Sequence, residues 1–98
     1  MDREEFLATL EGRTPPPGLR PELEALWWLM RGDWDRAHRI VQRLATVEAA
    51  RVHAHLHRVE GDLVNADWWY RRAGIPPMRE PLERERERLL ALLLDAHG

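Results

Sequence analysis

The stretch from His53 to Gly74 contains the residues of this chain that are best suited to do chemistry. It holds three of the five histidines, two of the five tryptophans and the only tyrosine. His53 and His57 lie four residues apart on a predicted helix, and Glu60 follows on the same stripe. Neighbours on one helical face can share a metal ion, and imidazole with carboxylate suits zinc or iron. His38, on the preceding predicted helix, can supply another ligand.

Three other residues lie on a different face of the same predicted helix: Arg51, His55 and Arg58. Two guanidinium groups beside an imidazole suit a carboxylate or a phosphate, because arginine binds planar anions through two parallel hydrogen bonds. The alternative is a solvated face whose arginines pair with Glu48 and neighbouring acids. These three residues are therefore candidate binding residues for an anion.

Aromatic and basic residues crowd the next predicted helix, which contains Trp68, Trp69, Tyr70, Arg71 and Arg72. Consecutive helical residues point about 100° apart, so both tryptophans cannot face the interior. We expect one of them to cover an adjoining helix or a partner. Aromatic residues together with arginine are typical of binding hot spots, which makes the two tryptophans, Arg71 and Arg72 binding candidates. Packing beneath a C-terminal helix is the alternative.

Composition indicates one small folded domain. The 98 residues suffice for a single core, and 44% hydrophobic with 33% charged residues is ordinary for a globular protein. A formal net charge of -2 gives no electrostatic reason to expect nucleic acid or an anionic membrane as partner. The chain has no cysteine, lysine or serine, which excludes disulfides, thiol chemistry, a Schiff-base lysine and a serine nucleophile.

The sequence contains no apolar run of the roughly 20 residues that a membrane-spanning helix needs. Its acidic start, MDREEFLATLEG, lacks the basic and apolar regions of a signal peptide. We therefore expect a cytoplasmic protein without a membrane partner.

Hydrophobic periodicity predicts an all-α fold, since no stretch alternates with a period of two. Four capping residues precede predicted helices: Asp2, Asp33, Thr46 and Asp62. Four glycines follow predicted helices: Gly12, Gly32, Gly61 and Gly74. The six predicted helices cover residues 2–11, 21–31, 34–45, 47–60, 63–73 and about 79–96.

Proline-rich segments divide the predicted helices. The segment R-T-P-P-P-G is a stiff extended linker, because each proline fixes its own φ and biases the preceding residue away from helix. The segment I-P-P at residues 75–77 prevents the fifth helix from continuing. The predicted single domain, residues 1–98, therefore has five parts: an N-terminal helix (1–12), a linker (13–18), a first unit (19–45), a second unit (46–77) and a C-terminal helix (78–98).

The two central units contain an internal repeat. G-D-W-D-R-A at residues 32–37 and G-D-L-V-N-A at residues 61–66 align without gaps. At these residues the chain resembles the tetratricopeptide repeat family, whose helix pairs turn at Gly-Asp-Tyr and carry alanine three residues after the aromatic. Val41 and Tyr70 match the next large position, and Pro77 lies near the closing proline. The resemblance covers residues 19–77, with a period shorter than the usual length of about 34 residues and two units rather than three.

The resemblance implies a compact right-handed helical repeat whose first and last helices act as caps. It implies that Ala37 and Ala66 lie where two helices cross closely. It also implies that the three anion candidates, Arg51, His55 and Arg58, line a concave groove.

The same resemblance gives the two spaced histidines a structural interpretation. It puts His53 and His57 at interior positions, where an imidazole packs edge-on and bonds a carboxylate such as Glu60 or Asp62. A lone H-x-x-x-H without the glutamate of the metalloprotease motif is a weak metal signal. We therefore expect no cofactor, and a metal site at His53, His57 and Glu60 is the alternative.

The central stretch also resembles a group of short uncharacterised bacterial proteins. They carry His-Arg-x-Glu-Gly-Asp-x-x-Asn-Ala followed by Trp-Tyr-x-Arg-Ala-Gly, which corresponds here to residues 57–66 and 69–74. This second resemblance adds no chemistry.

The last predicted helix has two halves. Residues 83–88 alternate glutamate and arginine, which indicates a solvated face without nucleic acid, because every arginine has an acidic neighbour. Leu89–Leu94 is apolar most of the way round, so it is buried within the domain, under an N-terminal helix that carries Phe6, or packs against a second subunit. Two units offer little surface to bury five leucines, so we expect a homodimer through Leu89–Leu94.

These patterns favour a small helical-repeat interaction protein, an adaptor that binds a peptide or a partner protein through the groove or the tryptophan-rich helix. The alternative is a metal- or anion-binding protein, enzymes included, that uses His53, His57, Glu60 and the arginines. No nucleophile–base pair is identifiable from spacing, so an enzyme reading rests only on clustered polar residues.

Overall fold

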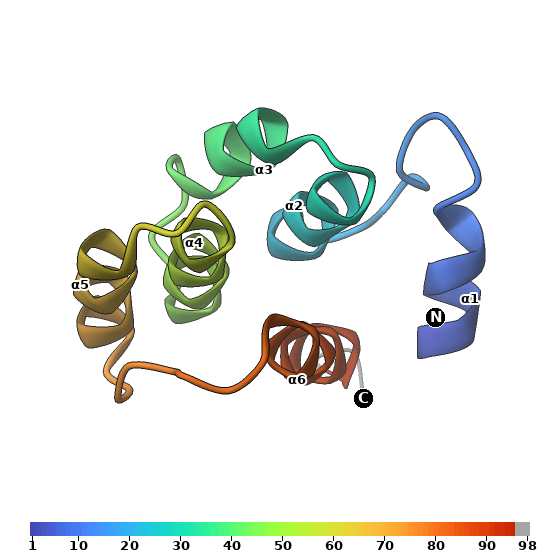
Figure 1. The fold of residues 1–98 in the computed structure, drawn as a ribbon. Coiled ribbons are helices and arrows are strands. Elements are labelled where there is room, and N and C mark those ends of the chain that lie inside the picture. Colours follow the sequence, from blue (N-terminus) through green and yellow to red (C-terminus); the bar gives the residue numbers. More distant parts are fainter. Residues whose placement is uncertain (96–98) are drawn as a thin grey trace.

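The computed structural model describes residues 1–95, and this part of the chain contains six α-helices and no strand (Figure 1). The helices are α1 (Arg3–Thr9), α2 (Pro21–Met30), α3 (Trp34–Val41), α4 (Val47–Val59), α5 (Leu63–Ala73) and α6 (Leu82–Asp95). The all-α prediction is therefore confirmed.

The observed helix ends match the prediction closely for α2, α4 and α5 and differ for α1, α3 and α6. Helix α1 ends at Thr9 instead of residue 11. Helix α3 ends at Val41 instead of residue 45, because Arg43 and Leu44 each bond to a carbonyl three residues earlier and tighten the chain into a turn. Helix α6 begins at Leu82 instead of near residue 79, because the residue before Pro81 is disfavoured in a helix. The predicted end near residue 96 lies outside the described residues.

The two Gly-Asp pairs form turns with the same geometry. Gly32 and Gly61 both have a φ of 85°, a conformation that costs glycine little and other residues much. The carboxylates of Asp33 and Asp62 then accept hydrogen bonds from the backbone amide three residues later, at 3.0 and 3.1 Å. These bonds satisfy amides that the first turn of a helix leaves without partners. The sequence therefore fixes where α3 and α5 begin.

Consecutive helices pack against each other from α2 to α5, and α4 also contacts α2. Helix α5 has α4 as its one packed neighbour among the described helices, so it forms an outer edge of the array (Figure 1). Helix α6 lies across α2 and α4 and also contacts α1. Helix α6 therefore does not cover the outer side of α5, where we expected it to act as a C-terminal cap.

The extended segment that precedes α6 allows this helix to reach its position. Gly74 ends α5 with a φ of 78°, and the prolines that follow keep the chain extended as far as α6 (Figure 1). This extended segment carries the chain past the end of α5 to the opposite side of α4. There Glu85 of α6 contacts three hydrogen-bond donors, on His55, Arg58 and Tyr70.

The main core is built where α6 meets α1, α2 and α4. Its fully buried large side chains include Phe6, Leu23, Leu26, Trp27, Leu56, Leu89 and Leu93. A second, smaller cluster between α4 and α5 consists of Ala54, Ala66 and Tyr70. Ala37 and Ala66 have no exposed surface, as expected for residues at close helix crossings.

One copy of the chain buries most of the leucine run. Leu89, Leu90, Leu93 and Leu94 are buried, and Leu92 is 37% exposed. Phe6 of α1 belongs to the same cluster as these buried leucines, so the second half of α6 packs beneath the N-terminal helix. The argument that two units cannot cover five leucines is therefore weakened, and the homodimer stays a prediction.

Within residues 1–95, no helix has both the length and the apolar character needed to cross a bilayer.

Replacing Ala66 by leucine tests the close crossing of α4 and α5. Ala66 is fully buried against Ala54 and Tyr70, so Ala66→Leu should overpack the contact and destabilise the fold by about 1–3 kcal/mol in chemical denaturation. Val64 lies on the same helix and is 84% exposed, so Val64→Leu is the matched control and should change stability by less than about 0.5 kcal/mol. Equal stability of the two variants would contradict the crossing.

Placing arginine at neighbouring leucines tests the orientation of α6. Leu93→Arg puts a charge where no surface is exposed and should unfold the domain. Leu92→Arg alters a partly exposed position and should leave the circular dichroism spectrum folded. Sedimentation of the wild type and of folded Leu92→Arg checks the dimer, because a dimer through this face should dissociate in the variant. A wild type that is monomeric at every concentration would refute the dimer.

Candidate functional site

Helix α4 carries three buried histidines and sends them to two sides. Helical residues four apart share a face, whereas residues two apart point to nearly opposite sides. His53 and His57 face α3, where they contact the ring of His38. His55 faces α6 and contacts Glu85. The chain therefore has two polar groupings, one on each side of α4.

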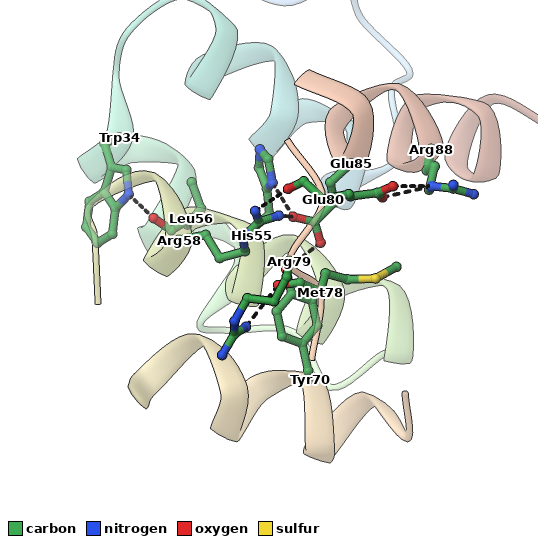
Figure 2. Close-up of polar contacts among 10 residues, drawn as sticks. All are labelled: Trp34, His55, Leu56, Arg58, Tyr70, Met78, Arg79, Glu80, Glu85 and Arg88. Atoms are coloured by element: carbon green, nitrogen blue, oxygen red, sulfur yellow. Dashed lines mark hydrogen bonds and ion pairs between the residues drawn. The ribbon is translucent and has the colours of Figure 1, made fainter. Parts of the chain in front are cut away.

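The first grouping, which we call the glutamate anchor, consists of Glu85, His55, Arg58 and Tyr70 (Figure 2). The Glu85 carboxylate has no exposed surface. Its Oε1 atom lies 2.7 Å from both His55 Nδ1 and Arg58 Nη1, and its Oε2 atom accepts a hydrogen bond of 2.5 Å from the Tyr70 hydroxyl. Arg58 also donates to the backbone carbonyl of Glu80. The anchor joins α6 to α4 and α5.

The charge on Glu85 is stabilised by its partners. Burial opposes the charge, but hydrogen bonds from His55, Tyr70 and Arg58 outweigh burial and hold the pKa of the carboxyl below its ordinary value. Burial and the bond to Glu85 raise the pKa of Tyr70, so its hydroxyl stays protonated and donates. The anchor is thus an ion pair with two further donors, in which Arg58, His55 and Tyr70 all bond to the Glu85 carboxylate.

The second grouping, which we call the histidine cluster, consists of His38, His53 and His57. Each residue has one ring nitrogen that lies within 4.8 Å of a nitrogen of the other two. Tryptophans enclose the cluster on two sides. The ring of Trp34 stacks on His38 with centroids 4.9 Å apart, and the ring of Trp69 stacks on His53 at 3.8 Å. Helices α3, α4 and α5 together position these rings.

The tautomer of His57 is set by a nearby carboxylate. His57 Nδ1 lies 2.5 Å from Oε1 of Glu60, which caps the end of α4. A carboxylate accepts hydrogen bonds, so Nδ1 carries the proton and donates it. In the neutral form of the ring, the other nitrogen, Nε2, has a lone pair available for a ligand.

The surroundings of His53 and His38 favour the neutral form of these two imidazoles. Burial, together with the neighbouring rings of His38 and His57, lowers the pKa of His53 to about 3. Burial and the proximity of His57 also lower the pKa of His38. At neutral pH both rings therefore carry lone pairs and no charge. These two rings can therefore accept a cation or a proton donor.

A hollow of about 530 Å³ lies on the outer side of α5. Its lining residues are Asp62, Val64, Asn65, Trp68, Trp69 and Arg71. Trp68 is 49% exposed and Val64 is 84% exposed. We call this surface, completed by Arg72, the α5 face. Trp69 lines the α5 face and also stacks on His53 of the histidine cluster.

The structure therefore separates residues that the sequence grouped together. His55 and Arg58, expected in an open groove with Arg51, lie in the glutamate anchor beneath α6, and Arg51 belongs to neither grouping. Trp68, Arg71 and Arg72 lie on the α5 face.

The structure brings the candidate metal ligands together, much as the sequence predicted. His53 and His57 share a face, and His38 from α3 joins them. Glu60 contacts His57 through a hydrogen bond. Asp62 caps α5 through the amide of Asn65.

Glu85 is the buried polar residue that the sequence analysis placed on a solvated face. It belongs to an alternating run of glutamate and arginine, in which residue type does not distinguish buried from exposed positions. Its register does: Leu89 and Leu93 follow at intervals of four residues and are both fully buried. A carboxylate on a leucine stripe is a signal of an internal partner.

Comparisons of the chain with protein-family models, with curated proteins and with solved structures gave no match.

Two glutamates of α6 provide a matched test of the glutamate anchor. Glu85→Gln removes a buried charge and leaves Arg58 without its carboxylate, so it should destabilise the fold by about 3 kcal/mol at neutral pH in chemical denaturation. Glu87 pairs with Arg3 at the surface, so Glu87→Gln should have a far smaller effect.

The pH dependence of this stability difference provides a further check on the charge of Glu85. The pKa of Glu85 is lower in the folded protein than its ordinary value of 4.5. The charged carboxylate therefore stabilises the fold fully above pH 4.5, and this stabilisation is lost as the pH falls through the pKa of the folded state. The gap between wild type and Glu85→Gln should therefore narrow in acid. A gap that is absent at pH 7 would show that Glu85 carries no stabilising charge.

Proposed function

We propose that this chain is a small interaction protein of two tetratricopeptide-like units, and that it binds a partner protein through the α5 face. The observation that carries the proposal is the exposure of Trp68 and Val64 on the outermost helix. The equal geometry of the two Gly-Asp turns and the buried alanines Ala37 and Ala66 support the repeat reading.

The surface of α2 and α4, where the binding groove was expected, offers less support for binding a partner. A groove ligand would have to reach His55 and Arg58, and both already contact Glu85. Helix α6 lies over the α2 and α4 surface that such a ligand would need. A partner is therefore expected on the other side of the array.

The outer side of α5 has the character of an uncovered repeat surface. Repeat arrays bury each unit against the next, and the terminal helix normally shows solvent a polar face. Apart from the Tyr70–Glu85 hydrogen bond to α6, helix α5 packs on α4 alone among the described helices, and it exposes Leu63, Val64 and Trp68 at 45%, 84% and 49%. A partner that covers this surface would take the place of the next unit.

The chemistry of the α5 face indicates which partner would fit. The hollow beside Trp68 and Val64 suits an apolar side chain, because burying both removes apolar area from water. Arg72 lies 5.7 Å from the ring centroid of Trp68, and Arg71 lines the hollow. Guanidinium groups on this rim favour an acidic residue on the partner. We therefore propose an amphipathic helix with an apolar stripe and acidic flanks.

Site-specific photocrosslinking tests the proposal in cells of the source organism. A photoreactive residue at Val64 should give a discrete protein adduct, since this position is the most exposed apolar one of the face. Trp68→Ala in the same chain should remove most of the adduct. The control places the photoreactive residue at Arg39, an exposed position on α3 that is not part of the α5 face.

Two outcomes would contradict the proposal. One is the absence of an adduct at Val64, and the other is the same adduct pattern from Arg39. Trp68→Ala should stay folded because Trp68 is half exposed, so the loss of the adduct in that variant would report on the face and not on folding.

A further inference from the structure

The histidine cluster puts three imidazole rings together in a place where apolar side chains would pack at a lower cost in free energy. Three imidazoles from α3 and α4 meet with ring centroids 4.7, 5.0 and 5.5 Å apart. Each ring has two polar nitrogens, and a buried nitrogen without a partner costs free energy. Nδ1 of His53 is buried and has no hydrogen-bond partner among the described residues. Apolar side chains would fill the same space without this cost.

A ligand that accepts several lone pairs at once would remove that cost. His57 already donates Nδ1–H to Glu60 and so presents Nε2 as an acceptor. Carboxylate, imidazole and metal in this order form an arrangement that is common around zinc, in which the carboxylate orients the ring and raises its basicity. Glu60 therefore has the position of an outer hydrogen-bond partner of a metal ligand.

We propose that the histidine cluster binds one divalent transition-metal ion, with zinc as the best fit, through His38, His53 and His57. Three imidazoles suit zinc, copper or nickel, and zinc commonly takes three histidines with a fourth position for water. Sequence spacing gave two histidines and Glu60 as the alternative site. The fold brings His38, which the sequence offered as a further ligand, close to these two imidazoles and puts Glu60 in the outer position.

The rearrangement needed to bind the ion is small. A zinc–nitrogen bond of about 2.0 Å in tetrahedral geometry puts neighbouring nitrogens roughly 3.3 Å apart. Nitrogens that now lie within 4.8 Å of one another must therefore approach by at most about 1.5 Å, which side-chain rotation can supply. His38 is only partly buried, so its ring has room to turn towards the other two.

A second group of potential ligands competes with this site. His57, Glu60 and Asp62 also offer ligand atoms within 4.8 Å of one another. The two acids are exposed, and exposed acids commonly cluster without a metal. The three-histidine set is preferred because His53 and His57 are buried and one nitrogen of His53 has no other partner.

Titration calorimetry of untagged, chelator-treated protein with zinc chloride tests the proposal. The wild type should bind one zinc ion per chain. His38→Gln removes one ligand at a partly buried position and should weaken binding at least about tenfold, and Glu60→Gln should weaken it by about 10–100-fold. Asp62→Asn keeps a side chain that can cap α5 and should leave the affinity unchanged. Circular dichroism checks that each variant is folded.

Cobalt(II) provides a readout that needs no variant. Cobalt bound by three imidazoles and water is four-coordinate and should show intense visible absorption that zinc displaces. Three results would each overturn the proposal: no zinc binding by the wild type, zinc binding unchanged in His38→Gln, or loss of binding in Asp62→Asn while His38→Gln retains it. The last result would move the metal to the exposed acidic group.

Discussion

The position of α6 depends on one buried carboxylate. Glu85 has no exposed surface, and a charge in that environment is tolerated only with close partners of opposite charge or hydrogen-bond donors. Arg58 and His55 from α4 and Tyr70 from α5 supply them (Figure 2). Leucines supply most of the apolar area that holds α6, but an apolar stripe alone tolerates sliding and rotation. The three directional bonds fix the helix in one register against α4 and α5.

This constraint decides which surfaces remain for function. With α6 across α2 and α4, this side of α4 is covered, and two of the three anion candidates, His55 and Arg58, are bonded to Glu85. The remaining chemistry lies on the other side of α4, in the histidine cluster and on the α5 face. Trp69 connects the two, because its ring stacks on His53 and its other edge lines the hollow beside Trp68. A partner that moves Trp69 would therefore also change the packing of the histidines.

The sequence predicts the features that depend on local chemistry. Gly32 and Gly61 with their following aspartates define two turns, and the turns fix the starts of α3 and α5 because capping involves residues only three apart. Helix type follows from periodicity in the same way. The burial of Ala66 is also predicted, although here the repeat alignment rather than the local pattern gives the answer.

Features that depend on contacts between distant helices are not predicted from the sequence. Glu85 and its neighbour Glu87 have the same type and similar local sequence, yet one is buried and the other pairs with Arg3 at the surface. The sequence offers His38 as a further ligand, but its contact with His53 depends on the crossing of α3 and α4, which residue spacing within one helix does not contain. The path of α6 past α5 likewise depends on where Glu85 finds its donors.

The most direct test of this arrangement is a carbon-13 NMR titration of the Glu85 side-chain carboxyl in the folded protein. The partners found here predict that this carboxyl titrates below the ordinary glutamate value of 4.5, since the donors of His55, Tyr70 and Arg58 outweigh the effect of burial. A carboxyl that titrates at or above 4.5 would contradict the arrangement. In that case Glu85 would not be the charged centre that holds α6 in place.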